Sequence, residues 1–214
     1  MNEESKKTIE YFDNFYKSCN IDDIKTDNWL WWFKEYIKKS NGPVVDLGCG
    51  LGNNVKYFLE EGMNVIPCDG SINAINKIKE KYPQIKQTAC FDMLEPFPLL
   101  NGITDLVVAD QSLHYFTKED TINILKKIKK LLYPEGNLLV RVNTVNNIPK
   151  EKNLVEEVER NLFRTKDGRL KRYFDEKDLY EIFNVFDIKY VRKDKMERYD
   201  NIKETYQLRL KKYK

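Results

Sequence analysis

The sequence lacks the features that direct a chain to a membrane or to nucleic acid. Its 214 residues contain no apolar run near the ~20 residues of a membrane-spanning helix. The first residues, Met1–Lys7, lack the apolar stretch of a signal peptide. The 37 basic and 34 acidic residues leave a net charge of +3, an excess too small to predict nucleic-acid or membrane binding. We therefore expect a cytoplasmic protein without membrane association.

Cysteine and histidine are scarce as well. The chain has one histidine and four cysteines. The cysteines are widely spaced and form no C-x-x-C pair, which argues against a zinc site. We expect no bound metal, and free thiols at Cys19, Cys49, Cys68 and Cys90.

The first 42 residues predict a helical cap. In the first helix, Ile9, Phe12 and Tyr16 fall on one face. A second helix ends at Asn41-Gly42-Pro43 and carries the aromatic run Trp29–Phe33. Two interpretations of this run stay open: packing in the core, which is favoured, or a contribution to a lid over the site.

From Pro43 the pattern changes to short apolar runs that alternate with helices. The predicted helices are Asn53–Glu61, Ser71–Lys81 and Thr117–Leu132. The expected strands are Val44–Leu47, Asn64–Cys68, Ile85–Cys90, Asp105–Ala109 and Leu138–Val142, with a turn at Tyr133–Gly136 before the last of them. Such alternation predicts a parallel sheet with helices on both faces.

The C-terminal part adds a long connection and two further strands. Residues 144–175 form an insertion with a helical piece at Leu154–Leu162 and a hairpin turn at Asp167-Gly168. A helix at Glu176–Phe183 precedes strands at Phe186–Val191 and Thr205–Leu210. We expect one domain: an α/β, doubly wound sheet of about seven strands, mostly parallel, with the last strand antiparallel. The insertion leaves the carboxyl edge of the sheet and is a candidate substrate lid.

A glycine-rich turn follows the first strand. Gly48, Gly50 and Gly52 let the backbone turn sharply and approach a ligand closely. A dinucleotide fingerprint would need its third glycine at position 53, which is asparagine. Asp46, two positions before the turn, would repel a pyrophosphate but can attract an ammonium group.

The run Asp46–Gly52 resembles the first motif of class I S-adenosylmethionine (SAM)-dependent methyltransferases. The resemblance covers about residues 43–143 and is closest to compact single-domain members, including the tellurite-resistance methyltransferases. It implies a Rossmann-like, SAM-binding core over residues 43–214, with S-adenosylhomocysteine as the product. In that family the acid lies near the amino group of the methionyl part, and the glycines pack against the cofactor.

Further positions take their roles from the same resemblance. An acid such as Asp69 binds the ribose hydroxyls, Asp92 and Met93 hold the adenine, and Asp110 faces the positive methionyl end. The alternatives are that Asp69 and Asp110 cap helices and that residues 92–93 form a solvated loop. The cofactor residues implied are Asp46, Gly48, Cys49, Gly50, Asn53, Asn54, Asp69, Gly70, Ser71, Asp92, Met93, Asp110 and Tyr115.

The acceptor is less defined. His114 follows the fourth strand and is a candidate base or orienting group, although a structural histidine is the alternative. The sequence lacks an Asn-Pro-Pro-Tyr or Asp-Pro-Pro-Tyr motif after that strand, and it lacks the cysteine setting of cytosine-C5 enzymes. Both absences favour a small-molecule acceptor. The insertion's cations admit an anionic substrate, RNA or a solvated hairpin; they are Arg164, Lys166, Arg169, Lys171 and Arg172.

Four functions stay open on the sequence alone. A small-molecule methyltransferase is favoured over an RNA or protein methyltransferase, a non-catalytic SAM-binding module and a nicotinamide enzyme. The pattern leaves open a monomer or a homodimer, and it does not define the accepting atom.

Overall fold

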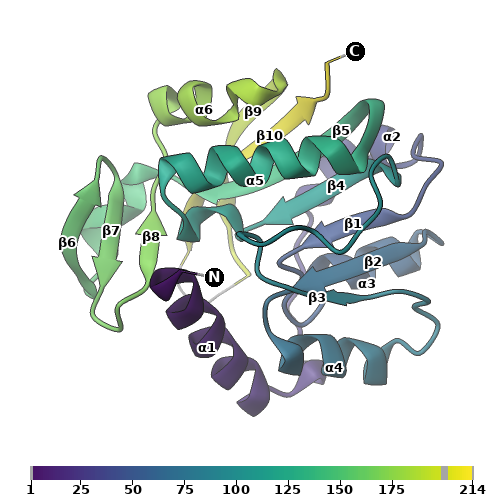
Figure 1. The fold of residues 1–214 in the computed structure, drawn as a ribbon, viewed down its shortest axis with the longest axis horizontal. Coiled ribbons are helices and arrows are strands. Elements are labelled where there is room, and N and C mark those ends of the chain that lie inside the picture. Colours follow the sequence, from purple (N-terminus) through teal and green to yellow (C-terminus); the bar gives the residue numbers. More distant parts are fainter. Residues whose placement is uncertain (1, 199–201, 214) are drawn as a thin grey trace.

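A seven-stranded mixed sheet forms the centre of the molecule (Figure 1). The computed structural model describes residues 2–198 and 202–213. The strand order is β3-β2-β1-β4-β5-β10-β9. The strands are β1 (Val44–Leu47), β2 (Val65–Asp69), β3 (Ala89–Cys90), β4 (Thr104–Asp110), β5 (Leu132–Asn143), β9 (Asp187–Met196) and β10 (Lys203–Lys211). Strands β1 to β5 pair in parallel, whereas β10 is antiparallel to both β5 and β9, as predicted.

Helices cover both faces of this sheet, because side chains alternate between the faces along each strand. Val45 packs in the cluster with α5 (Lys118–Leu131) and α6 (Glu176–Ile182). Its neighbour Val44 packs in the other cluster. That second face is covered by the 3-10 helix η2 (Trp29–Phe33), α2 (Lys34–Ile37), α3 (Asn53–Glu60) and α4 (Ile72–Lys81). Within the described ranges, no helix is both long and apolar enough to cross a membrane.

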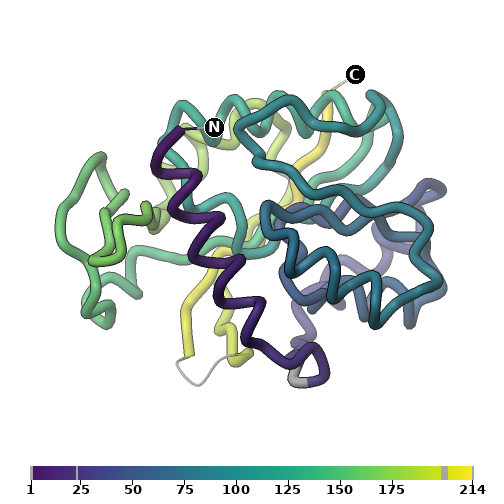
Figure 2. The backbone as a smooth tube through the Cα atoms, turned by 60° about the horizontal axis from the view of Figure 1, so that its bottom comes forward, coloured from purple at the N-terminus to yellow at the C-terminus, as the bar shows by residue number. Residues whose placement is uncertain are grey.

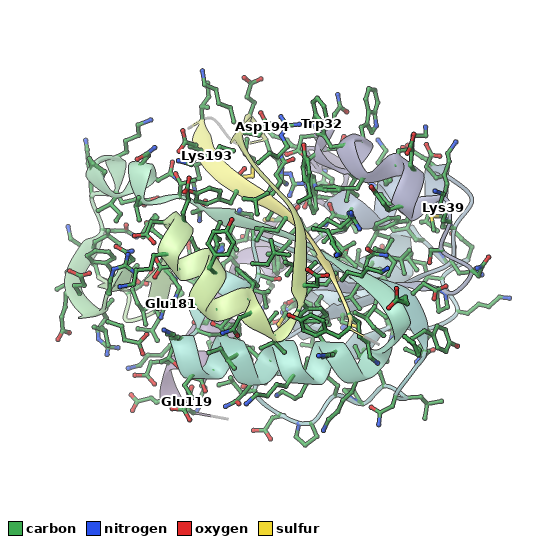
Figure 3. The ribbon with its side chains drawn as sticks, turned by 90° about the horizontal axis from the view of Figure 1, so that it is seen from above. Trp32, Lys39, Glu119, Glu181, Lys193 and Asp194 are labelled. Carbon is green, nitrogen blue, oxygen red and sulfur yellow. The ribbon has the colours of Figure 1, made fainter. Side chains whose placement is uncertain are left out.

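The aromatic run Trp29–Phe33 belongs mainly to the core. Trp29, Leu30 and Phe33 are buried against the sheet, whereas Trp31 and Trp32 are exposed. Figure 3 shows Trp32 at the molecular surface. The run forms a 3-10 helix followed by one short α-helix, so the continuous helix that we predicted here is interrupted.

The predicted helical piece at Leu154–Leu162 is wrong. Its first part is strand β6 (Leu154–Glu159), which pairs antiparallel with β7 (Leu162–Thr165), and β7 pairs with β8 (Leu170–Arg172). Pairing with β7 outweighs the local helical spacing of the apolar residues. The hairpin turn is confirmed, since Gly168 has a φ of +83° between β7 and β8.

Two other boundaries differ from the sequence pattern. The predicted strand Ile85–Cys90 is reduced to the two residues of β3. The predicted turn Tyr133–Gly136 lies inside β5, where the pairing with β4 is interrupted and Glu135 has a φ of +67°.

Helix α1 (Glu3–Ser18) lies at the carboxyl edge of the central sheet, between the small sheet β6–β8 and α4 (Figure 2). Asp13 fixes it there: the carboxylate accepts hydrogen bonds from Ser71 Oγ at 2.6 Å and from the backbone N–H of Asn73 at 3.0 Å. The Asn73 side chain adds a third bond at 2.8 Å. These bonds join α1 to the start of α4.

We expect Asp13→Ala to loosen α1 from the sheet, because three donors at the start of α4 lose their acceptor. The free energy of unfolding should fall by about 1–2 kcal/mol. Amide hydrogen exchange over residues 3–18 should become faster. The control is Glu10→Ala on the same helix, since Glu10 is exposed and its ion pair with Lys6 is long, at 3.9 Å. Equal exchange in both variants would contradict this role of Asp13.

Candidate functional site

A cavity of about 720 Å³ lies at the carboxyl edge of the sheet, within the range of small-ligand sites. Its walls come from the loops after β1, β2, β3 and β4 and from α1. His114 and every predicted cofactor residue except Asp46 line it. The face of α1 predicted from the sequence, with Ile9, Phe12 and Tyr16, lines it too.

The glycine turn has the geometry that glycine alone adopts without strain. Gly48, Gly50 and Gly52 have φ values of +73°, +52° and +90°. A Cβ atom on Gly48 would lie 2.4 Å from Cβ of Ser112, and one on Gly50 would lie 2.8 Å from Oη of Tyr16. The turn therefore needs glycine for its conformation and for close packing around the cavity.

The carboxylate of Asp69, at the end of β2, is fixed in place by two backbone N–H groups. One oxygen accepts the N–H of Gly50 and the other accepts the N–H of Ser71, each at 2.8 Å. Burial raises the pKa of this carboxyl group, and these hydrogen bonds offset part of that rise. Each carboxylate oxygen can accept a second hydrogen bond, so two adjacent hydroxyl groups can still bind.

Asp92 and Met93 follow β3 and line the same side of the cavity. Asp92 accepts a hydrogen bond from Ser5 Oγ of α1 at 2.7 Å and one from the N–H of Leu94 at 2.9 Å. Ser5 was missed in the sequence, where no local pattern marks it. Its contact places the start of α1 directly over the carboxylate predicted to bind the adenine.

Asp46 does not line the cavity, contrary to its predicted place beside the cofactor. It is fully buried and accepts a hydrogen bond from Asn54 Nδ2 at 3.3 Å. Asn54 lines the cavity and accepts a bond from Trp29 Nε1 at 3.0 Å. The second oxygen of Asp46 has no hydrogen-bond partner in the described part of the chain. Burial raises the pKa of Asp46 to about 7.

Asp110 lines the cavity, but its charge is already balanced. Arg141 binds both its oxygens, at 2.6 and 2.8 Å, and Arg198 binds one at 2.9 Å. Asp27 completes this buried network with bonds of 2.7 Å to Arg141 and 3.3 Å to Arg198. Burial alone would raise the pKa of Asp110, but the two guanidinium groups hold it at about 2. No motif or period in the sequence marks Arg198. That Asp110 faces the positive methionyl end stays a prediction.

His114 and Tyr115 lie beyond β4, in the 3-10 helix η3 (Leu113–Tyr115). His114 is 2% exposed, and its Nδ1 atom has no hydrogen-bond partner among the described residues. Burial, and then the charges of Lys171 and Lys203, lower its pKa well below 6.5. Its imidazole is therefore neutral near pH 7. Tyr115 packs edge-on against Phe12 of α1, with ring centres 5.2 Å apart.

Three comparisons with known proteins agree with this geometry. Residues 44–136 match the family described as a methyltransferase domain. This match supports a class I SAM-dependent methyltransferase core in the matched part of the chain. Of the two ligand classes that the glycine turn left open, the match supports SAM as the cofactor.

The curated relatives match over part of their length. An uncharacterised methyltransferase of Oceanobacillus iheyensis is 30% identical over 102 residues, which cover 48% of this chain and 47% of the relative. A mouse tRNA (carboxymethyluridine(34)-5-O)-methyltransferase is 31% identical over 112 residues, covering 50% of this chain and 16% of that protein. The chain spans about half the length of the bacterial relative.

Solved structures show the same fold. A SAM-dependent methyltransferase of Methanosarcina mazei has a TM-score of 0.69 at 18% identity, covering 85% of this chain and 97% of that chain. A 1,6-didemethyltoxoflavin-N1-methyltransferase of Burkholderia thailandensis, solved with S-adenosylhomocysteine, has a TM-score of 0.64 at 18% identity, covering 87% and 77%. At this identity the likeness concerns the fold alone.

The cavity contains groups that match SAM. Asp69 has acceptor capacity for two ribose hydroxyls, and the glycine turn presents backbone without side chains. Ser112 Oγ and Gln111 Nε2 are buried, line the cavity and have no partner in the described ranges. Such atoms are available to a polar ligand.

The raised pKa of Asp46 predicts a stability that depends on pH. The native state holds a proton that an unfolded carboxyl group, with its ordinary pKa of 3.8, releases. This stabilisation is fully present below pH 3.8 and is lost as the pH rises to about 7. Asp46→Asn carries no titrating group. We compare the free energies of unfolding of the variant and the wild type at pH 5 and pH 8. The difference, variant minus wild type, should be about 2 kcal/mol larger at pH 8 than at pH 5.

Urea unfolding at the two pH values measures this difference. The matched control is Asp105→Asn. Asp105 lies near the start of β4 and does not line the cavity. Parallel pH profiles for Asp46→Asn and the wild type would show that Asp46 titrates normally.

Proposed function

We propose that this protein transfers the methyl group of SAM to a small-molecule acceptor within the cavity. The observation that carries the proposal is the clamped carboxylate of Asp69 beside the glycine turn, in the same cavity as neutral His114. One end of the cavity then holds the cofactor and the other the acceptor. A cytoplasmic location is part of the same proposal.

On the cofactor side, each group has a chemical task. Asp69 would bind the ribose hydroxyls, and Asp92 would accept the adenine amino group beside Met93. Asn54 would bind the methionyl end, with Asp46 behind it as a positioning residue. SAM, when bound, supplies a methyl group on a positive sulfur atom that becomes neutral on transfer.

On the acceptor side, the chain itself has little chemistry to perform. Alignment of the accepting atom with the methyl group supplies much of the rate in such a displacement. His114 would take the proton that an O–H or N–H acceptor releases, at Nδ1. Residues 1–42 would act as a cap and residues 144–175 as a lid, which together exclude water.

A small acceptor is favoured over RNA because two arginines of the insertion are paired with carboxylates of this chain. Arg164 pairs with Glu156 at 3.5 Å and with Glu4 at 3.7 Å. Arg172 is buried and pairs with Glu159. Phosphate binding along RNA depends on cations that are free to replace counterions. The small molecule bound in the Burkholderia structure agrees with this interpretation, whereas the mouse relative's name keeps tRNA as the second candidate.

Asp69→Ala should lower the affinity for S-adenosylhomocysteine at least tenfold, because the ribose hydroxyls lose a charged acceptor that contributes roughly 1.5–3 kcal/mol. Isothermal titration calorimetry measures the affinity. Glu119→Ala is the control, because Glu119 is exposed on α5 and does not line the cavity (Figure 3). Unchanged affinity in Asp69→Ala would contradict the cofactor site.

His114→Asn should lower the rate of S-adenosylhomocysteine formation by about 100-fold while leaving the affinity for S-adenosylhomocysteine within about twofold. The assay supplies purified protein with SAM and fractionated metabolite extracts. If the wild type binds SAM but no fraction supports turnover, the protein is a binding module without activity. If turnover requires RNA, the acceptor class is wrong.

A further inference from the structure

Helix α1 has an aromatic face that the protein core does not cover. The buried residues of this helix are Ser5 and Thr8, whereas its aliphatic and aromatic residues are half-buried or exposed. All of the latter line the cavity: Ile9, Tyr11, Phe12, Phe15 and Tyr16. The apolar face of a surface helix ordinarily packs against the core. Here it faces the cavity, where a bound ligand would cover it.

The start of α1 contacts the loops of the cofactor side. Ser5 bonds Asp92, the carboxylate predicted to bind the adenine. One turn later Ile9 packs against Gly70, where a Cβ atom would lie 2.8 Å from Cγ1 of the isoleucine. From Ser5 to Phe12 the helix rises by about 10 Å. Phe12 therefore lies well away from the predicted adenine site.

The rings of α1 continue into the segment that carries His114. Phe12 packs edge-on against Tyr115, with ring centres 5.2 Å apart, and stacks on Tyr16 at 5.8 Å. Tyr115 in turn lies against His114, with ring centres 4.1 Å apart. Phe12, Tyr16 and Tyr115 thus form a continuous aromatic wall that reaches the candidate histidine of the acceptor side.

A planar group of the insertion already stacks beside this wall. The guanidinium carbon of Arg169 lies 3.5 Å from the ring centre of Tyr11 and 5.5 Å from that of Phe12. Asp167 accepts two bonds from the same guanidinium, at 2.7 and 3.0 Å. Arg169 also lines the cavity. Flat groups therefore fit against the rings of α1, and this one closes the wall toward the β7–β8 turn.

Buried polar atoms in the same cavity can bind the edge of a ring. Nδ1 of His114 and Oδ1 of Asn153 have no hydrogen-bond partner among the described residues, and both side chains line the cavity. A buried polar group without a partner is costly, so a ligand that bonds it gains affinity. N–H, O–H and carbonyl groups at the edge of a planar ring can form such bonds while the ring faces contact aromatic side chains.

We propose that the methyl acceptor is a planar aromatic or heteroaromatic molecule. Its ring lies against Phe12 and Tyr115, and its N–H or O–H group faces His114. Contacts between aromatic rings contribute more than the burial of their area alone. The role as acceptor rests on the proposed methyltransferase function. The preference for planar rings is a binding property and can be tested without turnover.

Two matched pairs of neutral probes test this preference: quinolin-2-one against octahydroquinolin-2-one, and 2-naphthol against decahydro-2-naphthol. The members of a pair share their polar group and bicyclic skeleton, but only one contains an aromatic ring. Calorimetric titration into protein saturated with S-adenosylhomocysteine should show at least one aromatic probe binding about tenfold more tightly than its saturated partner. The ring current of that probe should also shift the Cε1–H NMR signal of His114, the single histidine of the chain.

The paired variant Phe12→Leu/Tyr115→Leu should bind the aromatic and saturated probes alike, because leucine keeps an apolar contact but has no ring. Phe12→Tyr/Tyr115→Phe keeps both rings and should retain the preference. The control is Tyr180→Leu, since Tyr180 is an exposed aromatic residue of α6 outside the cavity wall. Thermal unfolding establishes that each variant is folded.

Four results would overturn the proposal. They are the absence of any preference for the aromatic probes in the wild type, a bound aromatic probe that leaves the His114 signal unmoved, an unchanged preference in the paired leucine variant, and an equal loss of S-adenosylhomocysteine affinity in that variant. The last result would assign the rings to the cofactor. A preference for aromatic probes without methyl transfer to any acceptor would leave the aromatic site intact and refute the proposed function alone.

Discussion

The buried network of Asp27, Asp110, Arg141 and Arg198 sets the geometry of the carboxyl edge. Burying an unpaired charge is very costly, so each of these side chains is stable in the interior only while its partners are present. The network joins the segment before η2, the ends of β4 and β5, and the segment after β9. It therefore ties together four parts of the chain that are far apart in sequence.

Asp110 and Arg198 of this network line the cavity, whose sides differ in chemistry. On the side of β1 to β3, backbone N–H groups and acids surround the space, which suits a ligand rich in hydroxyl and amino groups. Lys171 and Lys203 line the cavity as well, from β8 and β10. Helix α1 lines the cavity through Ser5, Ile9 and Tyr16, beside Asp92, Gly70 and Gly50. Such an arrangement suits the transfer of a group between two ligands held at opposite ends.

Local signals in the sequence were sufficient for the sheet and for placing the predicted cofactor residues other than Asp46 around one cavity. The strand–helix alternation depends on nearby residues, and Asp69 and Asp92 are marked by their position just after a strand. The helix predicted at Leu154–Leu162 is wrong because the apolar spacing there suits a helix, whereas pairing between β6 and β7 determines the structure. Lys171 was named among the insertion's cations, whereas no local signal marked Lys203, which lines the same cavity.

Long-range contacts explain the remaining differences. Ser5 bonds Asp92 across 87 positions, and Arg198 bonds Asp27 across 171. No period or motif in a single sequence encodes such pairs. The same limit applies to Asp46, whose predicted role beside the cofactor took no account of Asn54 on its cavity side.

A crystal structure with bound S-adenosylhomocysteine would test the division of the cavity most directly. We expect the ribose on Asp69 beneath α1, the sulfur near His114, and open space beyond that sulfur for the acceptor. A cofactor whose ribose lies away from Asp69, or whose sulfur faces away from His114, would contradict the account.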